Sequence, residues 1–131
     1  MNGSAIALDT NAAIRLLNDS GGAPTWLAEY RTVCLPLPVV AELTYGALKS
    51  QRIEQNLDRI YFLVSRSHVL EMDLETANVY GKVRLTLKLA ARPIPENDVW
   101  IAASCIQHAL PLATNEEHFK AVDGLALVAS P

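Results

Sequence analysis

Short apolar runs alternate with longer amphipathic segments along this chain. Five apolar runs have the length and composition of short buried strands, at residues 6–8, 33–35, 69–70, 112–113 and 126–128. The segments between them predict helices at residues 11–17, 24–30, 38–48, 53–64, 74–87 and 96–109. Strands that alternate with helices predict an α/β fold of three layers, with a mainly parallel central sheet flanked by helices.

Local signals mark where these helices begin and end. Gly21 and Gly22 separate the first two helices, and Pro38 stands at a first helical position, which tolerates proline. Asp73 is the expected N-cap of the long helix that follows it. The Pro-Ile-Pro segment at residues 93–95 ends that helix. The next helix is apolar on nearly all sides, which indicates burial against the sheet.

Composition narrows the class of protein further. The chain of 131 residues, half of them apolar, predicts one domain spanning residues 1–131 with a well-filled core. No apolar run approaches the roughly 20 residues of a membrane span, and residues 1–4 lack a secretion-signal pattern, so we expect a cytoplasmic protein with no membrane partner. Cys34 and Cys105 are expected to be small buried hydrophobic residues. The net charge of −3 argues against coating nucleic acid by bulk attraction, but permits an enzyme that binds a few phosphates locally.

Four isolated acids stand at strand or helix boundaries: Asp9, Glu42, Asp98 and Glu116. Asp9 ends the first predicted strand, which places it at the carboxyl edge of the sheet, where open α/β folds bind ligands. Carboxylates that converge there repel one another and resist ionisation, and a divalent cation removes that conflict. Oxygen ligands of this kind suit Mg²⁺ or Mn²⁺. The chemistry implied is metal-assisted hydrolysis of a phosphodiester.

Each acid also has a plainer interpretation. Asp9 is followed by Thr-Asn and is a good N-cap for the next helix. Glu42 has the usual alternative of an exposed helix acid. Asp98 lies in a first helical turn, where the macrodipole favours negative charge, although the apolar stripe that follows it points Asp98 toward the packed side. Glu116 and Glu117 open a predicted helix and could serve its dipole in the same way.

Four segments resemble the sequence motifs of PIN-domain nucleases. The first two are LDTN at residues 8–11 and PVVAELTYG at residues 38–46. The third is PIPENDVWIAA at residues 93–103, and the fourth is LATNEEHF at residues 112–119, followed by VDGL at residues 122–125. The motifs stand in family order and span essentially the whole chain. Within that family, the sequence most resembles the VapC toxins of bacterial toxin–antitoxin pairs.

The resemblance implies a fold, an activity and partners. It implies a parallel sheet flanked by helices and endoribonuclease activity that depends on Mg²⁺ or Mn²⁺. It also implies a homodimer, neutralised by a small cognate antitoxin of the VapB type. Carried over position by position, the metal-binding acids fall on Asp9, Glu42 and Asp98, and the supporting polar residues fall on Asn11, Thr114 and Asn115.

The chain departs from the family pattern in its fourth motif. Many relatives have aspartate where this chain has Glu116, and a second aspartate where it has His118. The longer Glu116 side chain is expected either to assist catalysis through a water molecule or a second ion, or to turn to solvent and leave a one-metal site. His118 is either a phosphate or proton contact or, as the preferred interpretation, a histidine on a helix surface.

A basic group in the middle of the chain is the expected contact for RNA. Arg84, Lys88 and Arg92 precede the third motif. Positive side chains of this kind bind the phosphate backbone of RNA. The alternative is a solvated helix face, which is the common role of any single charged residue.

Two other functions compete with the nuclease. A haloacid-dehalogenase-like phosphatase also begins with an aspartate after its first strand, but it needs a second acid two residues later, where this chain has Asn11. The other alternative is a catalytically impaired PIN-like domain that acts only by binding antitoxin or RNA. The replacement at Glu116 is the one sequence feature in its favour.

Overall fold

The computed structural model describes residues 4–19 and 24–130, and a five-stranded sheet lies at its centre. The strands are β1 (Ala5–Leu8), β2 (Thr32–Pro36), β3 (His68–Leu70), β4 (Leu112–Thr114) and β5 (Leu127–Ala129). They lie in the order β3-β2-β1-β4-β5, and each neighbouring pair is parallel. The predicted parallel sheet is therefore confirmed.

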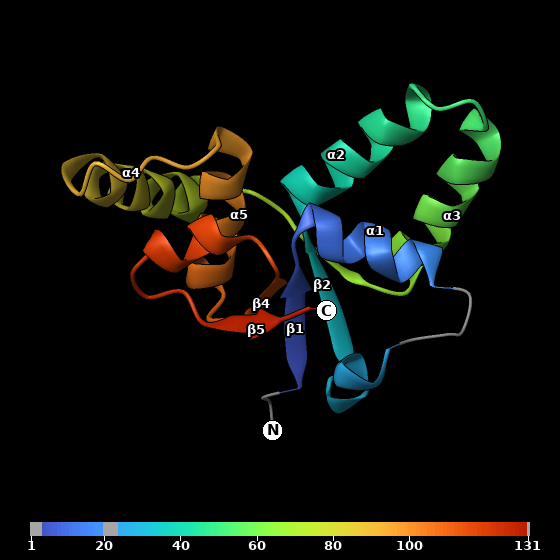
Figure 1. Cartoon of the computed structure of the whole chain (residues 1–131), viewed down its shortest axis with the longest axis horizontal. Helices are drawn as coiled ribbons and strands as arrows, with labels where there is room; N and C mark the ends of the chain where they lie inside the picture. Colours follow the sequence, from blue (N-terminus) through green and yellow to red (C-terminus); the bar gives the residue numbers. More distant parts are fainter. Residues whose placement is uncertain (1–3, 20–23, 131) are drawn as a thin grey trace.

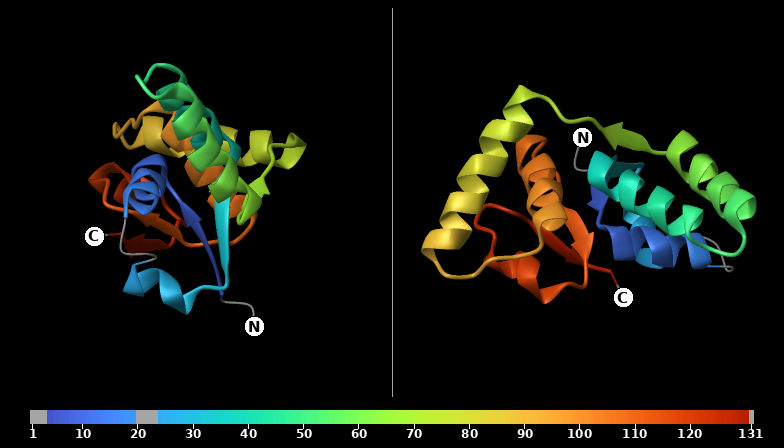
Figure 2. Two further views of the ribbon diagram at one scale, coloured as in Figure 1. Left: turned by 90° about the vertical axis from the view of Figure 1, so that its right-hand side faces the viewer. Right: turned by 90° about the horizontal axis from the view of Figure 1, so that it is seen from above.

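Helices cover both faces of this sheet. They are α1 (Thr10–Asn18), α2 (Leu37–Leu48), α3 (Ile53–Ser65), α4 (Leu74–Leu89) and α5 (Glu96–Gln107), with short 3₁₀ segments η1 (Thr25–Glu29) and η2 (Glu117–Ala121). The first three α-helices lie on one side of the sheet, and α4 and α5 lie on the other (Figure 1). The view from above shows the same separation (Figure 2). The three-layer α/β fold is confirmed.

The strand order reverses beside β1. From β1 the chain adds β2 and then β3 on one side, and it then crosses to the other side of β1 to add β4 and β5. The connection after β1 thus leads to one side of the sheet, and the connection after β4 leads to the other. The carboxyl ends of β1 and β4 lie next to each other at this point. In open α/β sheets, ligands bind in the crevice outside the strands at this point.

The core sits where the central strands meet α5. Ile6, Ala7 and Leu8 of β1 are completely buried, as are Leu112 and Ala113 of β4. Strands buried on both faces need continuous apolar runs rather than alternation, which is why these short runs were readable in the sequence. Both cysteines are buried and free, as expected, and burial raises the pKa of the Cys105 thiol to about 12.

Most element boundaries shift by one or two residues from expectation, and the following differences stand out. Residues 24–30, expected to form a helix, contain only the 3₁₀ segment Thr25–Glu29, because the backbone is extended at Pro24 before it and at Tyr30 after it. The segment after Glu116 is likewise a short 3₁₀ turn. The last strand begins one residue later than expected, because its pairing with β4 sets its register. The Gly21–Gly22 break lies outside the described residues.

The helices of the described segments carry no membrane span. None of them is long and apolar enough to cross a bilayer.

Candidate metal centre at the carboxyl edge of the sheet

Asp9 lies directly after β1 and is almost completely buried, with 2% of its surface exposed. One carboxylate oxygen accepts a hydrogen bond of 2.8 Å from the backbone N–H of Ala12, so Asp9 is the N-cap of α1. The other oxygen accepts a hydrogen bond from the hydroxyl of Thr114, at the end of β4. The capping interpretation of Asp9 is therefore correct, and the same residue also lies at the edge where β1 and β4 meet.

Asp98 reaches the same edge from the first turn of α5. Its side chain is 19% exposed, and its Oδ2 atom lies 2.7 Å from Nε2 of His118. The second ring nitrogen of His118, Nδ1, lies 3.9 Å from Oε1 of Glu116. The expectation of a surface histidine is therefore wrong, because the pairing of η2 with α5 places the His118 ring between two acids of the site.

The two glutamates are held by polar side chains of α1. The hydroxyl of Thr10 donates to Oε1 of Glu42, which projects from α2. The side-chain amide of Asn11 donates to Oε2 of Glu116 over 2.9 Å. The backbone N–H of Glu116 in turn donates to the Thr114 hydroxyl over 2.9 Å. Each of the four acids is thus held by a group from another segment of the chain, and two of those groups, Asn11 and Thr114, were predicted to support the site.

Burial perturbs the ionisation of Asp9. Desolvation raises the pKa of its carboxyl above the ordinary value of 3.8, because the charged form loses contact with water. The hydrogen bonds from Thr114 and Ala12 and the charge of Arg15 lower the pKa, and the charge of Glu116 raises it further. Burial therefore makes the charged form of Asp9 less favourable than that of an exposed aspartate.

Asp98 shows the same behaviour. Burial raises the pKa of its carboxyl, and the hydrogen bond and charge of His118 oppose that rise. The charges of Glu42 and Asp9 raise the pKa again. Carboxylates from three distant segments are thus close enough to influence one another through their charges.

The donor set fits a hard divalent cation in its chemistry. Carboxylate oxygens are the ligands that Mg²⁺ and Mn²⁺ prefer, and a cation would offset the cost of burying two acids. No three His, Cys, Asp or Glu side chains in the described segments are placed to hold a metal ion together. Each acid instead has its own partner, namely Thr114 for Asp9, Thr10 for Glu42, His118 for Asp98 and Asn11 for Glu116. Metal binding would require these side chains to turn toward a common point.

Other predicted residues lie outside this group of acids. The side-chain oxygen of Asn115 accepts a hydrogen bond of 3.0 Å from the backbone N–H of Ser130, so Asn115 anchors the segment after β5. Arg84 and Lys88 line a cavity between α4 and the start of α5. Arg92 is exposed in the turn between these helices and is not among the residues that line this cavity.

Sequence reasoning missed the contacts of Thr10 and His118. The sequence shows Thr10 only as the residue after Asp9, but its side chain holds an acid 32 positions away. His118 contacts an acid 20 positions away. Both residues belong to motifs, the first and the fourth. That position could have indicated a place in the site, because residues next to a candidate acid in the sequence lie near it in space.

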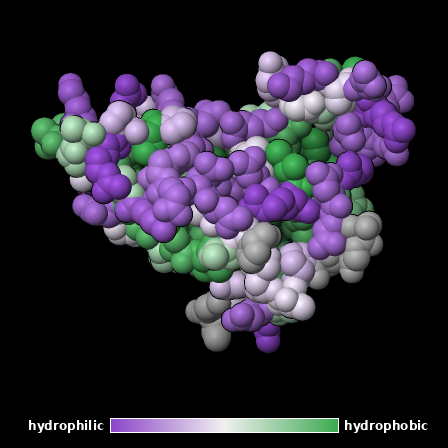
Figure 3. Space-filling view, in the orientation of Figure 1, coloured by the Kyte–Doolittle hydropathy of each residue, from purple (hydrophilic) through white to green (hydrophobic). Residues whose placement is uncertain are grey.

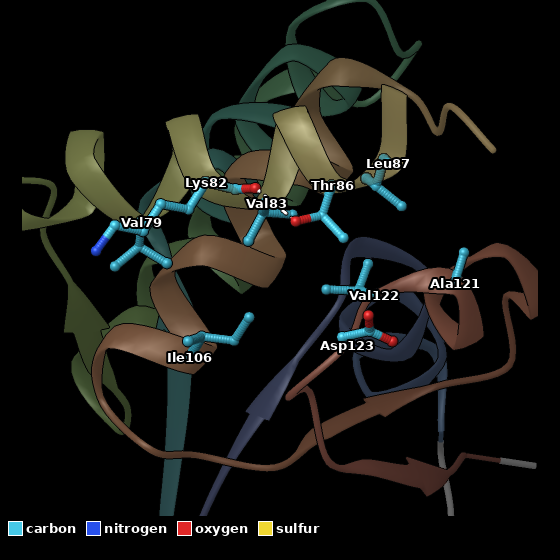
Figure 4. A pocket seen from close by; sticks show the side chains of 9 residues that line it. All are labelled: Val79, Lys82, Val83, Thr86, Leu87, Ile106, Ala121, Val122 and Asp123. Atoms are coloured by element: carbon cyan, nitrogen blue, oxygen red, sulfur yellow. Dashed lines mark hydrogen bonds between the residues drawn. The ribbon is translucent and has the colours of Figure 1, made fainter. Parts of the chain in front are cut away.

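The helices α2 and α5 diverge beyond the carboxyl ends of β1 and β2 (Figure 1). The space-filling view shows two lobes with a hollow between them (Figure 3). A separate cavity of about 300 Å³ lies between α4, α5 and the segment after η2, and none of the four acids lines it (Figure 4). Most of its lining is apolar, and the Lys82 amine points away from it (Figure 4). The Thr86 hydroxyl donates a hydrogen bond to the backbone carbonyl of Lys82. The carboxyl edge of the sheet, where Asp9 and Asp98 lie, is therefore the better candidate for chemistry.

Comparisons of sequence link this chain to known proteins. The sequence model of the family described as PIN domain matches residues 6–125. The chain is 34% identical over 126 residues to ribonuclease VapC1 of Haemophilus influenzae, a match that covers 90% of this chain and 92% of that protein. It is 37% identical over 94 residues to tRNA(fMet)-specific endonuclease VapC of Shigella flexneri, covering 71% of each protein.

A comparison of structures leads to the same group. The crystal structure of VapBC2 from Rickettsia felis, bound to a DNA fragment from their promoter, contains a similar chain with a TM-score of 0.85. The two chains are 28% identical, and the match covers 95% of this chain and 98% of that one. The similarity therefore extends over the sheet and both helical layers.

Proposed function

This chain belongs to the PIN domain family, and on that premise we propose that it is a metal-dependent endoribonuclease, the toxin of a cytoplasmic toxin–antitoxin pair. The observation that carries the proposal is the pair Asp9 and Asp98, which come from distant segments and share the switch-point edge of the sheet. Burial raises the pKa of both. Relatives that match most of the chain are named ribonucleases, which supports RNA as the substrate class.

Asp9, Glu42 and Asp98 are the residues that would hold Mg²⁺ or Mn²⁺. When bound there, the ion supplies an activated water molecule and offsets charge on the phosphate. The hydrogen bonds from Thr114 and Ala12 fix the orientation of Asp9 through both of its oxygens. Because Thr114 ends β4, the two central strands position this acid together.

Glu116 is proposed to handle a proton at the same edge, and His118 is proposed to position the acids beside it. Asn11 orients the Glu116 carboxylate, which would accept a proton from the attacking water. His118 stands between Glu116 and Asp98, where its ring binds Asp98 and steadies that side chain.

The partner proposed for this toxin is a small VapB-like antitoxin. The relative of known structure from Rickettsia felis is a VapBC2 assembly, which supports a partner of this kind. We propose a homodimer as well, as expected for the family. Co-expression with a neighbouring antitoxin gene, followed by purification through a tag on the antitoxin, tests the partner directly. A toxin that does not co-purify would contradict this part of the proposal.

The decisive experiment is cleavage of total RNA with Mn²⁺ by the wild-type protein and by Asp9→Asn. Asparagine keeps an oxygen for the Ala12 N–H, so the variant is expected to fold while cleavage is lost. Equal cleavage by both proteins, each free of contaminating nuclease, would sink the proposal. The impaired-domain alternative predicts a folded wild-type protein with no cleavage and no stabilisation by Mn²⁺. The phosphatase alternative is set aside, because the family match spans residues 6–125.

A further inference from the structure

A second functional surface lies on the other side of α5 from Asp98. A cavity of about 520 Å³ separates the carboxyl half of α4 from the residues that lead into α5, and the lining that matters here is Tyr80, Arg84, Lys88, Ile94 and Glu96. This volume is in the range of small-molecule sites. Glu96 and Asp98 are both in the first turn of α5, a rise of about 3 Å apart along its axis. Glu96 and Asp98 therefore belong to the same helical turn and face different sides of α5.

One wall of this cavity is a connected polar group. Arg84 donates to the hydroxyl oxygen of Tyr80 over 2.6 Å, and that hydroxyl donates to Oε2 of Glu96 over 3.0 Å. The Arg84 guanidinium lies 3.8 Å from the same carboxylate oxygen. Within the described residues, only one nitrogen of Arg84 has a hydrogen-bond partner. The wall thus presents guanidinium donors and a carboxylate acceptor side by side.

The Tyr80 ring in this wall is held by two neighbours. The Tyr80 ring stacks on Trp100 of α5, with centroids 3.8 Å apart and planes 20° apart, which fixes the orientation of the phenol. The Arg84 guanidinium lies over the Tyr80 ring at 5.8 Å. Lys88, exposed at the rim, adds positive charge, which favours a phosphate on a chain whose net charge is −3.

We propose that this cavity binds one unpaired guanine nucleotide of the RNA substrate, beside the phosphate that is cut; this inference rests on the proposed nuclease function. Glu96 accepts hydrogen bonds from N1–H and the N2 amine of guanine, and Arg84 donates to O6. Lys88 binds a flanking phosphate. The turn of α5 between Glu96 and Asp98 then sets the spacing between the recognised base and the metal centre.

Guanine matches this wall better than the other bases do. A carboxylate accepts two parallel hydrogen bonds, and guanine has two adjacent donors on its Watson–Crick edge with an acceptor next to them. Adenine and cytosine each have one amino group on that edge, and uracil has one ring N–H. A carboxylate beside a guanidinium therefore selects the donor–donor–acceptor order of guanine.

The test measures binding of labelled hexanucleotides by fluorescence anisotropy, with Asp9→Asn protein to prevent cleavage. A hexauridine with one central guanosine is compared with the same oligonucleotide carrying inosine, which lacks only the N2 amine. Loss of one hydrogen bond to a charged group predicts about tenfold weaker binding of inosine. Adding Glu96→Gln should bring the two oligonucleotides to within about twofold, since the charged acceptor is gone. If the protein that keeps Glu96 bound the guanosine and inosine oligonucleotides equally, the proposal would be overturned.

A matched control separates the cavity from general surface charge. Arg84→Ala is compared with Arg66→Ala, because Arg66 also lies over an aromatic ring, at 4.8 Å from Phe62, but directly after α3. Arg84→Ala should weaken guanosine binding about tenfold, and Arg66→Ala less than twofold. Equal effects of the two substitutions would overturn the proposal. Unchanged RNA binding by Arg84→Ala, together with an altered oligomeric state, would also overturn it, because that result would assign the cavity to a protein interface. Wild-type cleavage of total RNA in either case would leave the proposed nuclease function standing.

Discussion

The acids of the candidate metal centre fall into an inner pair and an outer pair. Asp9 and Asp98, the inner pair, have short side chains on the ends of buried elements, and their exposed fractions are 2% and 19%. Glu42 and Glu116, the outer pair, have longer side chains, and that of Glu116 is 40% exposed. Thr10 and Asn11 hold the outer pair from successive positions at the start of α1.

This difference indicates that the two pairs have different roles in the site. The inner acids have short side chains that cannot move far from the backbone. Their negative charges are destabilising in a buried position, and a bound cation would offset that cost. The outer acids can turn without disturbing the core, so they can adjust to an ion or a water molecule as it binds. A site of this kind needs both, because a rigid anchor alone would not complete a coordination shell.

The largest expected effect comes from removing an inner charge. Asp98→Asn should lower kcat/KM for RNA cleavage roughly a thousandfold or more, since metal binding contributes several kcal/mol to the transition state. Glu116→Gln should lower it only about tenfold, because the outer acid assists rather than anchors. Steady-state kinetics on one labelled RNA would give both values. Similar losses in the two variants would remove the distinction between inner and outer acids.

The next effect concerns stability in the presence of metal. Mn²⁺ at about 100 times its dissociation constant should stabilise the wild-type protein by about 2.7 kcal/mol, seen as a higher Tm in thermal unfolding. Asp9→Asn should remove this gain and also raise the Tm of the metal-free protein, because the buried charge is gone. Glu42→Gln serves as the outer-pair control and should keep part of the gain. A full Mn²⁺ response in Asp9→Asn would exclude Asp9 as an anchor.

A smaller effect is expected from pH in the absence of metal. The pKa values of Asp9 and Asp98 are raised in the folded protein, so above the ordinary value of 3.8 the folded state holds more protons than the unfolded chain. Stability with a chelator present should therefore fall as pH rises from about 3.8 through the raised values. Urea unfolding across this range measures the slope. The slope should be shallower in Asp9→Asn, and an unchanged slope would assign it to other groups.

The fold was predictable because its signals are local. The strands β1 and β4 are short unbroken apolar runs, and the capping box of Asp73 with Thr76 begins α4 where the sequence predicted. The 3₁₀ segments were not predictable as such, since five residues are too few for apolar spacing to separate them from an α-helix. The register of β5 was missed because it depends on pairing with β4, which is a long-range contact.

The site was predictable only in part for the same reason. Asp9 and Asp98 were found because each follows a recognisable local boundary. The role of His118 was misjudged, since its partner Asp98 lies on another helix and only the packing of η2 against α5 brings them together. The cavity beside Glu96 had no sequence signal beyond its basic residues, because its wall combines side chains from two helices.

The smallest expected effect tests whether Asn115 belongs to the candidate metal centre. Asn115→Ala removes the acceptor for the Ser130 N–H and should cost about 1 kcal/mol of folding stability, with a less than twofold change in cleavage. Asn115→Asp keeps an acceptor oxygen and should recover most of the loss. Urea unfolding and the cleavage assay, applied to the same preparations, separate the two readouts. A cleavage defect as large as that of Glu116→Gln would move Asn115 from the anchor of the carboxyl-terminal segment into the outer shell of the metal centre.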